Sequence, residues 1–114
     1  MEENIKEELK NNSRTFINSA NLVYHKKDYT SATVLYFKAL FYILDLIILN
    51  KKGFIPKDHS ERFRILEREF LDLYIITDKL FPIYRNSYST SISHENCLLV
   101  KENVERIAKE QKIY

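Results

Sequence analysis

Apolar residues recur along most of the chain at spacings of three, four and seven, the repeat of an amphipathic helix. This pattern predicts helices over residues 3–25, 29–50, 58–78 and 94–112. Pro82 marks either the start of a short extra helix, ending around Arg85 or Asn86, or a kink within one long helix. We therefore predict an all-α fold, an antiparallel up-and-down bundle of four to five helices that forms one domain over residues 1–114.

The segment from residue 29 to residue 49 is the most apolar part of the chain. Only Lys38 and Asp45 are charged there, and because they lie seven positions apart they share one helix face. Each would cost about 2.5–3.5 kcal/mol near the centre of a bilayer, so we favour a buried central helix over a membrane span. A helix that is apolar on two faces needs cover on both, from the other helices and, on the second face, from a second subunit.

The breaks between the predicted helices carry residues that begin or end helices. Asp28 or Thr30 can cap the second helix, and Gly53, the only glycine, follows its end, where a left-handed residue is common. Asp58, with a glutamate three positions later, forms a capping-box pattern. Ser93 can cap the last helix after the polar loop 86–93.

The amino-acid composition excludes several classes of protein. With one Gly, two Pro and one Cys in 114 residues, the chain lacks the turns of most β folds, a glycine-rich phosphate loop and a disulfide framework. A balance of 18 basic to 16 acidic residues does not predict strong phosphate-driven affinity. The acidic, charged start is unlike a signal peptide, and a lone Cys97 fits a reducing compartment, so we expect a cytoplasmic protein.

Few side chains form a recognisable chemical site. No two of His25, His59 and His94 lie three or four positions apart, so we predict no metal site and no cofactor, and each histidine is interpreted as a capping or surface residue. Cys97 lies on an apolar helix face and is predicted to belong to the core.

Two groups of arginines remain. Residues 62, 64 and 68 are interpreted as part of a solvated face paired with neighbouring glutamates. Arg85 and Asn86, followed by Tyr88 and then by His94, are the strongest candidates for chemistry. A guanidinium near a helix end can bind phosphate, and a histidine can transfer a proton near neutral pH.

The order of these features resembles the HEPN family (higher eukaryotes and prokaryotes nucleotide-binding). The likeness covers about residues 10–110, and no single motif carries it. Its parts are Lys27-Asp28-Tyr29 with Ala32, the aromatic run Tyr36-Phe37 to Phe41-Tyr42, Lys52-Gly53, Asp58-His59-Ser60, and Tyr84-Arg85-Asn86 before a polar loop.

The resemblance implies a homodimeric helical bundle associated with nucleotides or RNA. It favours the partner of a minimal nucleotidyltransferase in a toxin–antitoxin pair, without strong catalysis of its own, binding through Arg85, Asn86 and Tyr88. Alternatives are a metal-independent ribonuclease using Arg85 and His94 at a dimer interface, or a non-catalytic interaction module. Family ribonucleases carry Arg-x4-6-His, whereas here the spacing is Arg-x8-His.

Overall fold

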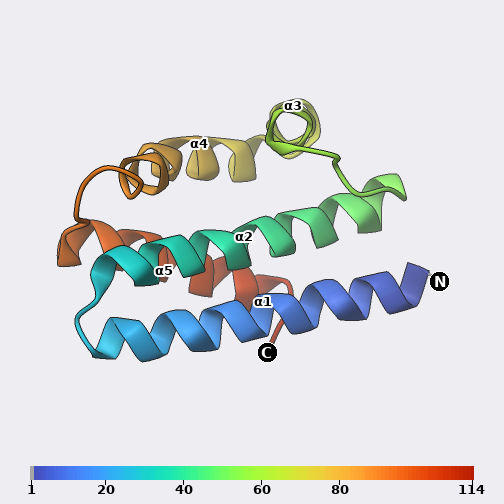
Figure 1. Cartoon of the computed structure of the whole chain (residues 1–114). Helices are drawn as coiled ribbons and strands as arrows, with labels where there is room; N and C mark the ends of the chain where they lie inside the picture. Colours follow the sequence, from blue (N-terminus) through green and yellow to red (C-terminus); the bar gives the residue numbers. More distant parts are fainter. Residues whose placement is uncertain (1) are drawn as a thin grey trace.

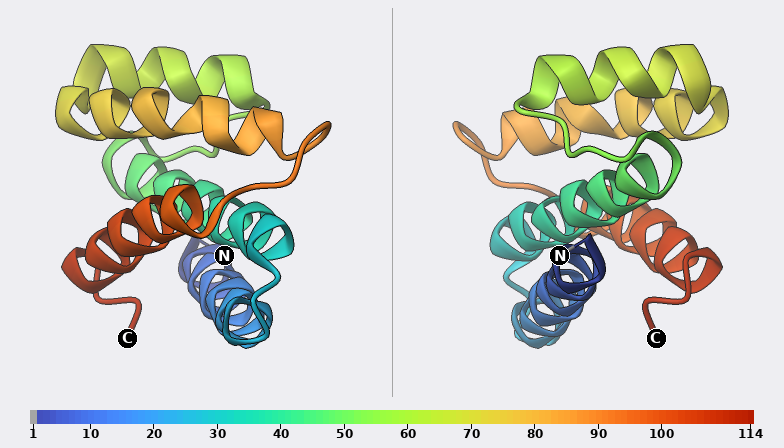
Figure 2. Two further views of the ribbon diagram at one scale, coloured as in Figure 1. Left: turned by 90° about the vertical axis from the view of Figure 1, so that its left-hand side faces the viewer. Right: turned by 90° about the vertical axis from the view of Figure 1, so that its right-hand side faces the viewer.

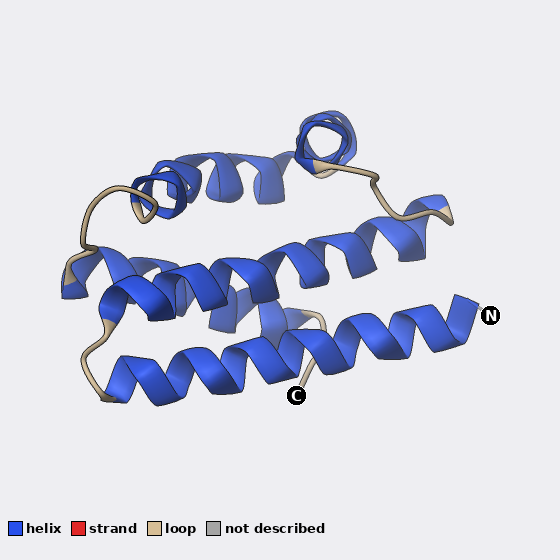
Figure 3. Ribbon diagram, viewed as in Figure 1, coloured by secondary structure: helices blue, strands red, loops and turns tan. Residues whose placement is uncertain are grey.

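Five helices make up the fold in the computed structural model, which describes residues 2–114 (Figure 1). They are α1 (Glu2–His25), α2 (Tyr29–Lys52), α3 (His59–Glu69), α4 (Leu71–Asn86) and α5 (His94–Glu110). Turns and loops connect them, and no strand occurs among the described residues (Figure 3). The predicted all-α bundle is confirmed, and α5 ends two residues before its predicted end.

Helix α2 is the centre of the molecule. It lies between α1 and α5 on one side and the α3–α4 pair on the other (Figure 2). It is long and apolar enough to cross a membrane, but 78% of its most apolar stretch is buried by the rest of the protein, as in the core helix of a soluble protein. Both faces are covered within one chain, so α2 itself requires no second subunit. Its fully buried large side chains are Tyr36, Phe37, Leu40, Ile43, Leu44 and Ile48.

The predicted helix caps are present. The side chains of Asp28, Asp58 and Ser93 accept hydrogen bonds from backbone N–H groups three residues ahead, at 3.1, 2.8 and 3.1 Å. Gly53 has φ +82° and its N–H donates to the carbonyl of Leu49. These bonds satisfy backbone groups that a helix end would leave free, which fixes where α2, α3 and α5 begin and where α2 ends.

The prediction of a single helix over residues 58–78 is wrong, because the helix is interrupted at Phe70. Its backbone is non-helical (φ −138°, ψ 61°), and its N–H closes α3 on the carbonyl of Leu66 while its own carbonyl accepts from Tyr74. The apolar spacing continues through the break, so the pattern carries no sign of it. The break lets α4 fold back, so that Phe63 of α3 meets the Tyr74 and Phe81 rings at 6.4 and 5.1 Å between centroids.

Pro82 lies inside α4 rather than at the start of a separate helix. The helix runs through it to Asn86, which is the predicted end. Proline lacks the N–H that would bond four residues back, but Pro82 and Asp78 are both exposed, where water can reach the freed carbonyl.

Replacing Gly53 with alanine should destabilise the protein by about 1 kcal/mol, because a side chain is disfavoured at positive φ. An added Cβ would meet no atom within 4 Å, so the loss would come from the backbone and not from a clash. The free energy of unfolding in urea measures it. Lys27 is a non-glycine residue that already has a positive φ of 67°. Replacing it with glycine, which favours such a φ, should therefore not destabilise the protein in this way. An equal loss in both variants would contradict the explanation.

Candidate functional site

Asp45 and Arg62 form a buried ion pair between α2 and α3. The Arg62 Nε donates to Asp45 Oδ1 at 2.8 Å, and a terminal nitrogen donates to Oδ2 at 3.1 Å. Both residues are 8% exposed. The predicted solvated position of Arg62 is therefore wrong. Its guanidinium turns inward over the Phe41 ring, 4.8 Å from the centroid, and neutralises the one carboxylate that α2 brings into the core.

His59, the first residue of α3, completes this cluster. Its Nδ1 lies 2.6 Å from the second terminal nitrogen of Arg62. Because arginine can only donate, Nδ1 must accept, and the ring proton of the neutral imidazole lies on Nε2. Desolvation of the ring, and then the charge of Arg62, lower the pKa of His59. The ring also packs on Phe41, 4.6 Å between centroids.

A pocket of about 260 Å³ opens beside the cluster. Lys38 and Asp45 both contribute to it, as expected from their shared face of α2. Burial and the hydrogen bond to Tyr88 raise the pKa of Tyr84 to about 12, so this phenol is protonated at neutral pH. The residues that line the pocket are Phe16, Lys38, Phe41, Tyr42, Asp45, His59, Arg62 and Tyr84.

The sequence contains a signal for this cluster. Lys38 and Asp45 lie seven positions apart in an otherwise apolar helix, so they place charged side chains on one of its faces. His59 and Arg62 lie one turn apart at the start of the next helix, where they can act together. Only the packing of α3 on α2 pairs Asp45 with Arg62 rather than with another cation.

The predicted site residues Arg85, Asn86 and Tyr88 lie at the end of α4 and in the following turn, and all three are exposed. The Arg85 guanidinium lies 5.9 Å from the centroid of the Phe81 ring, and no carboxylate among the described residues pairs with it. Tyr88 is 74% exposed, and its hydroxyl lies 2.9 Å from that of Tyr84. A free guanidinium and an open aromatic ring thus lie within one turn of each other.

His94, the first residue of α5, has partners of its own. Its Nε2 lies 2.8 Å from the Tyr24 hydroxyl, and its ring stacks on Tyr29 at 4.5 Å between centroids. The preceding loop is held to the start of α2 by the Ile92 N–H, which donates to Thr30 Oγ1 at 2.8 Å. No hydrogen bond joins Arg85 and His94 in residues 2–114, and each has partners of its own.

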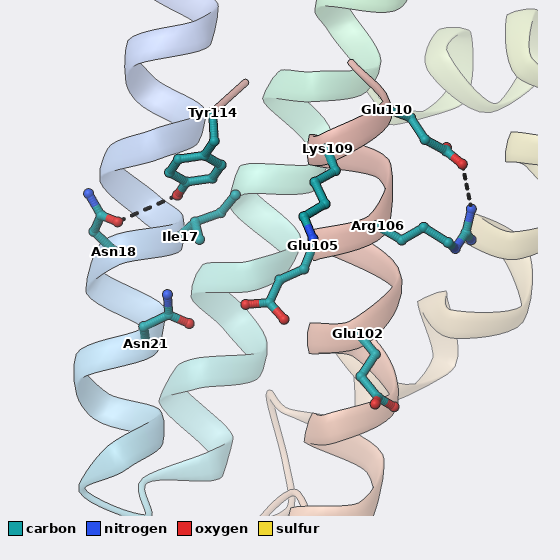
Figure 4. A pocket seen from close by; sticks show the side chains of 9 residues that line it. All are labelled: Ile17, Asn18, Asn21, Glu102, Glu105, Arg106, Lys109, Glu110 and Tyr114. Carbon is teal, nitrogen blue, oxygen red and sulfur yellow. Dashed lines mark hydrogen bonds and ion pairs between the residues drawn. The ribbon is translucent and has the colours of Figure 1, made fainter. Parts of the chain in front are cut away.

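A hollow of about 750 Å³ lies between α1 and α5 (Figure 4). Ile17, Asn18 and Asn21 of α1 face charged side chains of α5, and Tyr114 closes one end through a 3.4 Å bond to Asn18. Three glutamates outnumber the two cations there, which disfavours phosphate. No histidine or cysteine lines it. The charged residues are Glu102, Glu105, Arg106, Lys109 and Glu110.

The remaining chemical candidates behave as structural residues. Cys97 is fully buried, and burial raises the pKa of its thiol, which confirms it as a core residue. Within residues 2–114, no group of three or more His, Cys, Asp or Glu side chains is arranged to hold a metal ion.

Comparison of the chain with protein-family models, with curated proteins and with solved structures finds no match. The candidate site therefore rests on the residues and on the geometry described above.

Asp45→Ala should destabilise the protein by about 3–5 kcal/mol, because it leaves the Arg62 charge buried without a partner. Removing both charges in Asp45→Ala/Arg62→Ala should cost less than the sum of the two single changes. Urea unfolding measures all three variants. Asp72→Ala, an exposed aspartate on α4, is the matched control and should change stability by less than about 0.5 kcal/mol. Similar losses in Asp45→Ala and the control would contradict a buried pair.

The lowered pKa of His59 predicts a loss of stability on acidification. The unfolded chain binds a proton near the ordinary histidine pKa of about 6.5, whereas the folded chain binds it only at lower pH. Between those two values the unfolded state holds more protons, so the free energy of unfolding falls as the pH falls. Urea unfolding at about pH 7 and about pH 5 should show a smaller loss in His59→Gln than in the unmodified protein. Equal losses would show that His59 does not contribute.

Proposed function

We propose that this protein is a HEPN-like, RNA- or nucleotide-associated helical bundle that works with a minimal nucleotidyltransferase in a toxin–antitoxin-type pair and has no strong catalysis of its own. The observation that carries the nucleic-acid part is the exposed Arg85, free of any carboxylate among the described residues, beside the open Tyr88 ring. A guanidinium can bind a phosphate, and an aromatic ring can stack on a base of any identity.

The absence of strong catalysis is supported by the contacts of His94. A metal-independent ribonuclease needs its arginine and histidine at the same phosphate. Here Arg85 lies over Phe81, whereas His94 is held by Tyr24 and Tyr29. The ribonuclease alternative places the two residues together at a dimer interface, as the family resemblance implies.

A homodimer belongs to the proposal through the family resemblance, and the surface of α4 is compatible with it. Leu71 and Ile75 lie one turn apart on α4 and are 56% and 55% exposed. Light scattering on the purified protein tests the pairing. Co-expression with the product of a neighbouring nucleotidyltransferase gene, followed by co-purification, tests the partner.

Arg85→Ala should weaken binding of a single-stranded RNA oligonucleotide about fivefold and reduce the slope of log K against log salt by about 0.7, the loss of one phosphate contact. Tyr88→Ala should weaken binding by about 1 kcal/mol or more, while Tyr88→Phe, which keeps the ring, should bind nearly as well as the unmodified protein. Fluorescence anisotropy over a salt series measures these effects.

Arg64, an exposed arginine on α3, provides the control for general charge. If Arg64→Ala weakens RNA binding as much as Arg85→Ala, the binding follows net charge and the proposed site is wrong. The same oligonucleotide should remain intact during the assay. Cleavage leaving 2′,3′-cyclic phosphate ends, lost in Arg85→Ala, would instead establish the ribonuclease alternative.

A further inference from the structure

The pocket beside Asp45 and Arg62 contains more hydrogen-bond donors than the protein itself uses. Arginine has five N–H groups, and three of those of Arg62 are bound, two by Asp45 and one by His59. Two N–H groups of a nine-tenths buried guanidinium therefore lack a protein acceptor. Because His59 accepts through Nδ1, its Nε2–H is a further donor at the same pocket.

The charge of the pocket favours an anion. Asp45 neutralises one of its two permanent cations, Arg62, and Lys38 supplies the second. Lys38 is exposed, and no carboxylate among the described residues pairs with it. The net charge of the lining is thus positive, with its donors supplied by two helices, α2 and α3. The one lining carboxylate, Asp45, is bound to Arg62 through both of its oxygens.

The walls are aromatic and the space is small. Phe16 of α1 and Tyr42 of α2 stack at 5.6 Å between centroids on one side, while Phe41 and Tyr84 form the rest of the apolar lining. A volume of about 260 Å³ lies just below the usual range of ligand pockets, which is about 300–1,000 Å³. Such a space suits one ring with one charged group, and excludes most of a larger molecule.

From these observations, we propose that the pocket binds a small phosphate monoester whose phosphate accepts from Lys38, Arg62 and His59 and whose planar ring lies against Phe16 and Tyr42. The residues that hold the phosphate here differ from Arg85 and Tyr88, although Tyr84 of the pocket is hydrogen-bonded to Tyr88. The proposal does not depend on the proposed function. A non-nucleotide aryl phosphate and a pyrimidine mononucleotide present the same chemistry, so both are used as probes.

Titration of the amide signals in ¹H–¹⁵N NMR spectra of the full chain tests the proposal. Inorganic phosphate and phenyl phosphate should both shift amides around residues 38, 59 and 62, and phenyl phosphate should bind more tightly. Phenol, which has the ring alone, should not bind there. Uridine 5′-monophosphate compared with phenyl phosphate then shows which source of the phosphate the pocket prefers.

Lys38→Gln should weaken phenyl phosphate binding about fivefold, the loss of one charge-assisted hydrogen bond. Lys79→Gln, the same change at an exposed lysine of α4 outside the pocket, should bind like the unmodified protein. The same spectra show that each variant is folded. The proposal is overturned if no amide shifts at millimolar phenyl phosphate, if phenol binds equally well, or if Lys38→Gln and Lys79→Gln behave alike.

Discussion

An apolar helix as long as α2 must be covered along most of its circumference, and the other four helices pack around it. Burial of its large side chains removes apolar surface from water at about 25 cal/mol per Å². Helix α1 covers one side, α5 a second, and the α3–α4 pair the third. The same burial takes Asp45, seven residues after Lys38, into the interior with the apolar side chains around it. A buried carboxylate without a partner would be costly, so α3 must supply a cation at that point.

Arg62 supplies that cation, and its position depends on how α3 begins and ends. The Asp58 cap fixes the first turn, and the break at Phe70 turns the following chain back across α3. Within that first turn His59 and Arg62 lie side by side over Phe41. The polar cluster therefore joins two helices and also forms one wall of the pocket. One arrangement of side chains serves stability and leaves donors available for a ligand.

The two surfaces suited to phosphate differ in their physical character. The pocket at Lys38, His59 and Arg62 is small, partly buried and preorganised by hydrogen bonds. The surface at Arg85 and Tyr88 is open, at the end of α4, and suits a flexible strand more than a small molecule. Preorganised donors lose little freedom on binding, whereas exposed side chains must be ordered by the ligand.

The sequence alone determined the helical class and most of the helix ends. These follow from local rules: apolar spacing, capping side chains, and a glycine in the left-handed region after α2. It also marked Lys38 and Asp45 as sharing a face. The tertiary structure decided the break at Phe70, the inward turn of Arg62, and the separate partners of Arg85 and His94. These three features depend on which helices pack against each other. Contacts between distant residues, such as Asp45 with Arg62 or Ile92 with Thr30, produce no periodic pattern in the sequence from which they could be predicted.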